Sequence, residues 1–553
     1  MSIIGNKRIR GILFVILILA LAAGLSHPSV RAAENRTDSL SDRSGPDWTK
    51  LEGTKLRDIE ADEIRVLNLM AMVVRQRLAK EGGSFSPQAR VLARSAGQAF
   101  RQADYYRTYR YVTRAIISLA GEELSETTEV ATSLNFVLNR ALLSPGDPMI
   151  ISLQPAFTLG GPLSGTYTAR LSFRDATGTV VQEVGTIHIS EMRDYDIEVS
   201  TDSLKAGGYL ADYELLDPKG DRSVFASRRF VVHDGYRPRL ADLKAKMNQL
   251  EEADVALKGI PHRAAMETIA FVIESLGRAD KQYISSFWAS VHPITMHIRS
   301  LRLDPAGRAY FDVDPELGLA ESLAADLLAG KNPFQKRTGD MRLAYRSSVD
   351  GELVPFRVFA PEGYDPAKKY PMIVGLHGAN GDEHSFMEGR GGLFKRLGQE
   401  RGYVLATPSG RGPYGGYEGA AEQDVVDVTE RVMQLYSVDP ARVFLTGHSM
   451  GGQGTWYVGF NHPDTFAALA PIAGTSKPRR GPIPFENKLD MPVLFSHGAN
   501  DTVNLVENAR RTAELARERL SSFRYDEYPD CEHNDVVDAA LPKIFDFFDQ
   551  QAK

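Results

Sequence analysis

The sequence predicts a multidomain protein. Helical segments and an antiparallel β-sandwich precede a C-terminal domain built on a mostly parallel β-sheet with helices on both faces. Three observations predict this fold class. The chain has 553 residues, too many for one ordinary domain. Along the chain, apolar residues first recur every three or four positions, then every second position, and then every three or four positions again. From about Gly339, short apolar runs alternate with helical stretches, as in a parallel sheet buried on both faces.

Composition and charge are typical of a soluble globular protein, with 43% hydrophobic and 25% charged residues. The formal net charge is −6, so no general attraction to nucleic acid is expected. The chain has one cysteine and therefore cannot form an intramolecular disulfide. Neither composition nor charge indicates an oligomeric state.

Residues 1–32 have the layout of a secretory signal peptide. Lys7, Arg8 and Arg10 precede an apolar run over 12–25, and small residues follow near Ala32. The run is short for a membrane span, which needs about 20 apolar residues. We therefore expect an extracytoplasmic protein, periplasmic or secreted, with no stable membrane insertion once the signal is removed. The alternative is an uncleaved segment that anchors the chain. Residues 33–55 are polar and are interpreted as a linker.

The next three regions are assigned from their periodicity. Residues 56–144 and 236–338 place apolar side chains three and four apart, which predicts a helical region and a helical connecting region. Between them, 145–235 alternates at period two. Tyr167, Ala169 and Leu171 share one face, and turn residues follow at 175–178 and 217–220. This pattern predicts an immunoglobulin-like β-sandwich. The sandwich could bind sugar chains, but a spacer is favoured because no exposed aromatic cluster is evident.

The catalytic domain is expected over 339–553, and its clearest motif is Gly447-His448-Ser449-Met450-Gly451. An apolar strand leads directly into this motif, and a helix is expected to follow. That context is typical of a nucleophile elbow, a tight turn that exposes a reactive serine hydroxyl. A glycine-rich turn with an idle serine is the alternative. The strand before the motif favours Ser449 as a nucleophile.

A serine nucleophile needs a base, and the base needs an orienting acid. Asp501 follows one strand and His533 follows the next, in the chain order Ser, Asp, His. His497 competes as the base, but it precedes the acid and is interpreted as structural. Cys531, two residues before His533, is expected to be a bystander. Three other acids lie too near His533 in sequence to reach its ring from a separate strand end. They are Asp526, Asp530 and Asp535.

Stabilisation of a developing oxyanion requires two backbone N–H groups. One is expected from Met450, directly after the nucleophile, and the other from Ala379, in the loop that follows the first long buried strand. A second glycine-rich loop, "PSGRGPYGGYEGA" at 408–420, lacks the lysine of a phosphate-binding loop. We interpret it as a pocket wall, with Arg411, Tyr414 or Tyr417 touching substrate.

Four segments carry a family resemblance: "LHGANGDE", "DPARVFLTGHSMGGQGTW", "FNHPDTFAALAPIAG" and "HGANDTVN". They resemble the α/β-hydrolase superfamily, and are closest to its secreted esterase and predicted-peptidase branch. That branch is similar to prolyl-oligopeptidase-like and to polyhydroxybutyrate-depolymerase or feruloyl-esterase-like hydrolases. The resemblance covers about 339–553 and implies the roles assigned above. The family often has glycine just before the histidine, where this chain has Glu532.

Three functions are compatible with this sequence. The first is a serine hydrolase that cleaves a small-molecule or polymer ester through an acyl-enzyme, without metal or cofactor. The second is a serine peptidase with the same machinery. It is less favoured because no propeller-like repeat of about 40–50 residues precedes the domain. The third is a non-catalytic binding protein on a hydrolase scaffold, against which the complete Ser, Asp and His set argues.

Overall fold

The computed structural model describes residues 51, 53–56, 87–119, 123–252, 259–281, 313–379, 381–411, 415–476 and 481–551. The expected signal peptide, nearly all of the linker and residues 57–86 of the expected helical region lie outside the described residues. The chain forms two compact units, one within 1–235 and 278–312 and the other within 236–277 and 313–553. Within the described ranges, no helix is both long enough and apolar enough to cross a membrane.

Three helices come first among the described elements of the first unit: α5 (Pro87–Arg101), α6 (Tyr105–Leu119) and α7 (Glu126–Ser133). Helices α5 and α6 pack against each other as a hairpin. Ser125 caps the N-terminus of α7 through a capping box with Thr128. The buried Glu129 of α7 accepts hydrogen bonds from Arg110 at 2.9 Å and Arg114 at 2.5 Å, which ties α7 to α6.

The described residues of this unit also include eight strands in two sheets. The first sheet has the order β1-β3-β6, and the second has the order β2-β8-β7-β4-β5. Their inward side chains form one apolar core shared by both sheets. The strands are β1 (Leu134–Leu138), β2 (Leu142–Leu143), β3 (Met149–Pro155), β4 (Tyr167–Asp175), β5 (Val180–Ile189), β6 (Tyr195–Val199), β7 (Gly207–Leu216) and β8 (Arg222–Val232).

The strands begin earlier than the sequence predicted. β1 and β2 lie inside the region expected to be helical up to residue 144. In β1, Leu134, Phe136 and Leu138 are buried and the residues between them are half-buried, which is a period of two over only five residues. So short a run does not separate strand from helix by pattern alone. The immunoglobulin-like type expected for this region stays a prediction.

The second unit begins with α8 (Tyr236–Glu252), α9 (Ile260–Ala279, its last two residues in the first unit) and α11 (Val313–Leu328). These helices were expected to form a connecting region; α8 packs on α11, and α9 and α11 each contact the sheet that follows. The Oγ1 atom of Thr268 in α9 accepts the N–H of Ala344 at 3.1 Å. Glu316 in α11 pairs with Arg342 at 2.6 Å. The helices therefore belong to the same compact unit as the sheet.

The sheet of this unit has eight strands in the order β16-β15-β14-β13-β11-β12-β10-β9. From β12 to β16 neighbouring strands run parallel, while β10 is antiparallel to both of its neighbours. The sheet is therefore mostly parallel, as predicted. The strands are β9 (Gly339–Arg346), β10 (Leu353–Ala360), β11 (Tyr370–Leu376), β12 (Val404–Pro408), β13 (Val438–His448), β14 (Ala468–Ile472), β15 (Val493–Gly498) and β16 (Phe523–Tyr528).

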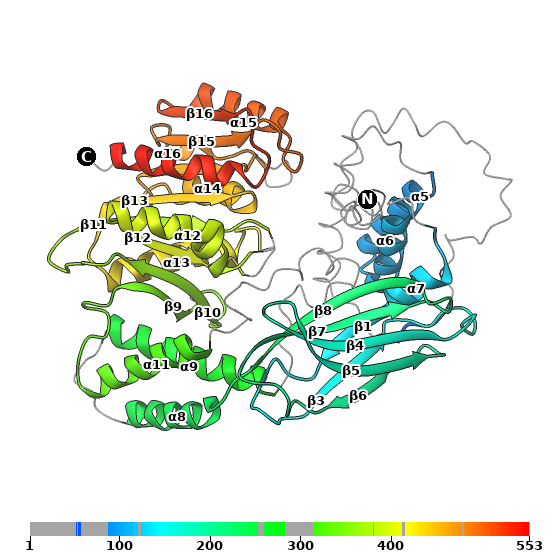
Figure 1. The fold of residues 1–553 in the computed structure, drawn as a ribbon. Helices are drawn as coiled ribbons and strands as arrows, with labels where there is room; N and C mark the ends of the chain where they lie inside the picture. The colour runs from blue at the N-terminus through cyan, green and yellow to red at the C-terminus, as the bar shows by residue number, and fades with distance from the viewer. Residues whose placement is uncertain are drawn as a thin grey trace, which may run out of the picture. The chain divides into compact units, whose positions relative to one another are not determined.

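Helices cover both faces of this sheet (Figure 1). α12 (Glu383–Arg401) and α16 (Val536–Gln551) contact each other and share one apolar core with the sheet. α13 (Ala420–Leu435) contacts α14 (Met450–Asn461), and α15 (Val506–Arg519) packs on β15 and β16 beside the short helix η2 (Phe485–Asn487). Because the sheet is buried on both sides, its reactive groups can reach substrate only where the strands end.

Candidate active site

Ser449 occupies a strained turn between β13 and α14. Its φ is +57° and its ψ is −111°, a backbone conformation that a residue with a side chain rarely adopts. The two flanking glycines allow the turn to close. A Cβ on Gly447 would lie 2.5 Å from the carbonyl oxygen of Gly451, and a Cβ on Gly451 would lie 2.1 Å from that of Leu376. The strand, the turn and the helix form the elbow that the sequence predicted.

The structure brings Ser449, His533 and Asp501 together in one hydrogen-bonded chain. The Nε2 atom of His533 lies 2.8 Å from the Ser449 Oγ atom, and its Nδ1 atom lies 2.7 Å from Asp501 Oδ2. The three residues follow β13, β15 and β16 at the carboxyl edge of the sheet. With Nδ1–H donated to the carboxylate, Nε2 is free to accept the serine proton. This geometry suits a nucleophile, a general base and an orienting acid.

Asp501 is held by its surroundings. Its Oδ1 atom accepts the backbone N–H groups of Val503 and Asn504, both at 2.8 Å. The buried His497 ring lies beside it, with Nε2 at 2.8 Å from the carbonyl oxygen of Asn504 and 3.4 Å from Asp501 Oδ2. Since a carbonyl only accepts, His497 donates to it. Burial lowers the pKa of His497, so His497 supports the acid as a neutral side chain, in line with the structural role inferred for it.

The loop expected to bind the oxyanion lies against the elbow. β11 pairs with β13 so that Leu376 is opposite Gly447, and the residues after each strand meet. A Cβ on Gly378 would lie 3.5 Å from the Cβ of Ser449. Ala379 follows directly. Met450 is the first residue of α14, so its N–H has no acceptor within the helix. Met450 thus follows Ser449 directly, and Ala379 follows the glycine that approaches the Ser449 side chain, while their role as donors stays a prediction.

Three residues of the glycine-rich loop were expected to touch substrate. Tyr414 lies outside the described residues. Tyr417 is fully buried, and its hydroxyl donates to the carbonyl oxygen of His377 at 3.3 Å. The guanidinium of Arg411 binds Asp424 and Asp350. Both side chains are thus engaged within the protein, and their contact with substrate stays a prediction.

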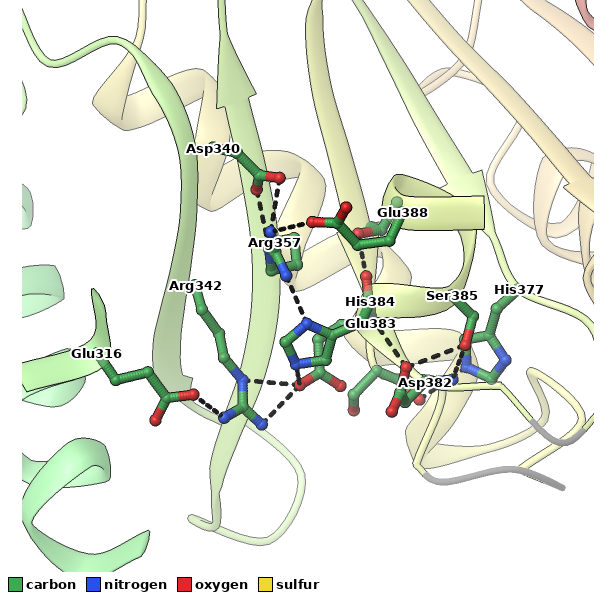
Figure 2. Close-up of polar contacts among 12 residues, drawn as sticks. Glu316, Asp340, Arg342, Arg357, His377, Asp382, Glu383, His384, Ser385 and Glu388 are labelled. Atoms are coloured by element: carbon green, nitrogen blue, oxygen red, sulfur yellow. Dashed lines mark hydrogen bonds and ion pairs between the residues drawn. The ribbon is translucent and has the colours of Figure 1, made fainter. Parts of the chain in front are cut away.

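Buried charges hold the helix that follows the oxyanion loop (Figure 2). Asp382 caps the N-terminus of α12, and its neighbour Glu383 binds Arg342 at 2.7 Å. Burial opposes ionisation of Glu383, but the Arg342 guanidinium and the hydrogen-bonded His384 together keep the pKa of Glu383 well below its ordinary value. The same guanidinium binds Glu316. This network could not be predicted from the sequence, because no motif links residues so far apart.

Cys531 lies in the loop before His533 and is partly buried. Burial raises the pKa of its thiol, which keeps it protonated and weakly nucleophilic. Its carbonyl oxygen accepts the N–H of Asn500 at 3.0 Å, so its main chain joins the two loops that carry the acid and the base.

Comparison with known proteins locates this domain among hydrolases. The sequence profile of the prolyl oligopeptidase family matches residues 399–481, a stretch that includes Ser449. The resemblance to the α/β-hydrolase fold expected from the sequence rests on three structural features of this unit. The elbow, the loop after β11 and the chain order of the three polar residues agree with that fold.

Two curated proteins that this chain resembles carry esterase names. A bifunctional acetylxylan esterase/xylanase of Neocallimastix patriciarum is 27% identical over 26% of this chain and 21% of its own. A probable feruloyl esterase C of Aspergillus terreus is 27% identical over 26% of this chain and 53% of its own. The chain thus spans between a fifth and about half of these relatives. A solved ferulic acid esterase of Anaeromyces mucronatus is 19% identical over 38% of this chain and 89% of its own, with a TM-score of 0.33.

Proposed function

We propose that this protein is a serine hydrolase that cleaves carboxylic esters through an acyl-enzyme intermediate. The observation that carries the proposal is the hydrogen-bonded chain from Ser449 through His533 to Asp501. His533 takes the serine proton as Ser449 attacks the ester carbonyl, and then gives it to the departing alcohol. A water molecule, activated by the same histidine, releases the acid. The N–H groups of Ala379 and Met450 stabilise the oxyanion in both steps.

The ester reaction is favoured by the curated relatives, two of which carry esterase names. A peptidase activity is the second candidate, because the prolyl oligopeptidase profile matches the elbow region. In the described residues ahead of the catalytic unit, the strands form two sheets around one core rather than the blades of a propeller. The expected substrate is therefore a small-molecule or polymer ester.

A fluorophosphonate probe and a substrate screen test this proposal. The probe should label the wild-type protein at Ser449 and should not label Ser449→Ala. The matched control is Cys531→Ser. It replaces a thiol in the loop before His533, leaves Ser449, His533 and Asp501 in place, and should still be labelled. A paired screen of p-nitrophenyl esters and peptide amides then identifies the bond. Failure to label the folded wild-type protein would favour the non-catalytic binding protein, and preferential amide cleavage would favour the peptidase.

We also propose that the mature protein is extracytoplasmic and begins near Ala33, following the signal layout of the first 32 residues. Amino-terminal sequencing of exported protein should give a start close to that residue. Recovery of the intact Met1 segment in the membrane fraction would instead support the anchored alternative.

A further inference from the structure

The loop after β16 that carries His533, called the base loop below, is held by a side chain that is not one of the hydrogen-bonded residues Ser449, His533 and Asp501. His448, the residue before the nucleophile, has its Nε2 atom 2.7 Å from the backbone carbonyl oxygen of His533. A carbonyl oxygen can only accept a hydrogen bond, so the His448 ring carries its proton on Nε2 and donates it. The two imidazole rings lie with their centroids 4.8 Å apart. The elbow therefore binds the main chain of the residue whose ring activates it.

A second element holds the next carbonyl of the same loop. Arg390 donates to the backbone oxygen of Asn534 and pairs with Asp538 at 3.5 Å. It lies in a kink of α12, where Arg390 and the two glycines after it all have positive φ. A residue with a side chain is strained in this conformation, which indicates that the contacts of Arg390 hold it there. Consecutive carbonyls of the base loop are thus bound from β13 and from α12.

His448 is suited to this position because it stays neutral. Burial, together with the nearby His533, lowers the pKa of His448 to about 3. The Arg390 guanidinium also opposes a proton on its ring, and His497, the remaining group that faces it, would do so only when protonated. When His533 becomes an imidazolium during the reaction, its neighbour therefore adds no second charge.

We propose that His448 is a positioning residue for the hydrolase reaction: its Nε2–H fixes the main chain of His533 so that the imidazole faces Ser449. This inference rests on the proposed function. Asp501 fixes the ring of His533 through Nδ1, and His448 fixes the backbone from which that ring extends. With only one of the two anchors, the ring can move away from the serine hydroxyl.

Two amide variants test the inference, because they differ in reach rather than in polarity. In His448→Gln the side-chain nitrogen can occupy the position of Nε2 and still donate to the carbonyl of His533. In His448→Asn the nitrogen falls short, near the position of Nδ1. A displacement of the catalytic groups of about 1 Å can cost on the order of 10²-fold in rate. We expect His448→Asn to lower kcat by about that factor with KM nearly unchanged, and His448→Gln to retain most of kcat.

The measurements are kcat and KM on the best ester of the screen and the rate of fluorophosphonate labelling of Ser449, with circular dichroism to verify folding. The matched control is His462→Asn, at the C-terminal end of α14, which should behave as wild type. Equal activities of the folded Gln and Asn variants would overturn the positioning role while the proposed function stands. If His448→Asn does not fold, His448→Gln alone decides. A folded Gln variant whose kcat is lower by about 10²-fold would also overturn the positioning role. An unlabelled, inactive wild-type protein would remove the proposed function itself, and this inference with it.

Discussion

Substitution of Gly451 by alanine tests the geometry of the active site through a single methyl group. A Cβ at this position would lie 2.1 Å from the carbonyl oxygen of Leu376 and 2.7 Å from that of His377. Real Cβ atoms essentially never lie within 3.0 Å of such an atom, so α14 and the end of β11 would have to separate by at least 0.9 Å. Both contacts are to backbone, which cannot rotate away as a side chain could. The separation would move the oxyanion loop away from Ser449.

A misplacement of this size can cost on the order of 10²-fold in rate. We therefore expect Gly451→Ala to lower kcat by about that factor, measured by ester hydrolysis, and to slow fluorophosphonate labelling to a similar degree. Gly318→Ala is the matched control. Gly318 lies within helix α11 of the same unit, and no atom lies within 4 Å of a Cβ added there. The variant should therefore keep full activity, and alanine should stabilise the helix by about 0.5–1 kcal/mol. Wild-type activity in Gly451→Ala would refute the close approach of α14 to β11.

Three further predictions concern the same site. Ser449→Ala and His533→Ala should each lower turnover by several orders of magnitude, and the double variant should be little worse, because the two residues act as one unit; losses that multiply would contradict the shared mechanism. Asp501→Asn should also be severe, and Cys531→Ser nearly silent, in the same ester assay. The midpoint of urea unfolding should decrease when the pH is lowered from 7 to 5, and it should decrease less in His448→Gln. Burial holds the pKa of His448 at about 3 in the folded protein, against about 6.5 in the unfolded chain. Between these values only the unfolded chain binds the proton, so the folded state loses stability as the pH decreases. An equal fall in both proteins would show that His448 does not titrate in this way.

The grouping of Ser449, Asp501 and His533 could be predicted because its signals are local. The elbow requires glycine on both sides of Ser449, so five consecutive residues specify a strand, a turn and a helix. Parallel strands then bring their carboxyl ends to one edge of the sheet, and a polar residue after a late strand must lie near that edge. This is why Asp501 and His533 could be chosen over nearer acids and over His497 without any knowledge of distances.

The side chains around the constellation could not be predicted, because their partners are set by tertiary packing. Arg411 and Tyr417 are found in a glycine-rich loop at a strand end, which is also what a pocket wall would provide. Only the positions of Asp424, Asp350 and the carbonyl of His377 show that both are engaged internally. The short strands β1 and β2 were missed for a different reason, since two to five residues are too few for a period to be recognised.

The family resemblance begins at about residue 339, but the physical unit that positions the site begins earlier. Arg342 in β9 is mostly buried and bridges Glu316 of α11 and Glu383 of α12. When one member of a buried ion pair is removed, the charge left behind is uncompensated, at a cost of about 3–5 kcal/mol. Glu383 follows the cap of the helix that begins after the oxyanion loop. The helical segment before residue 339 therefore contributes, through a single guanidinium, to the position of the loop that carries Ala379.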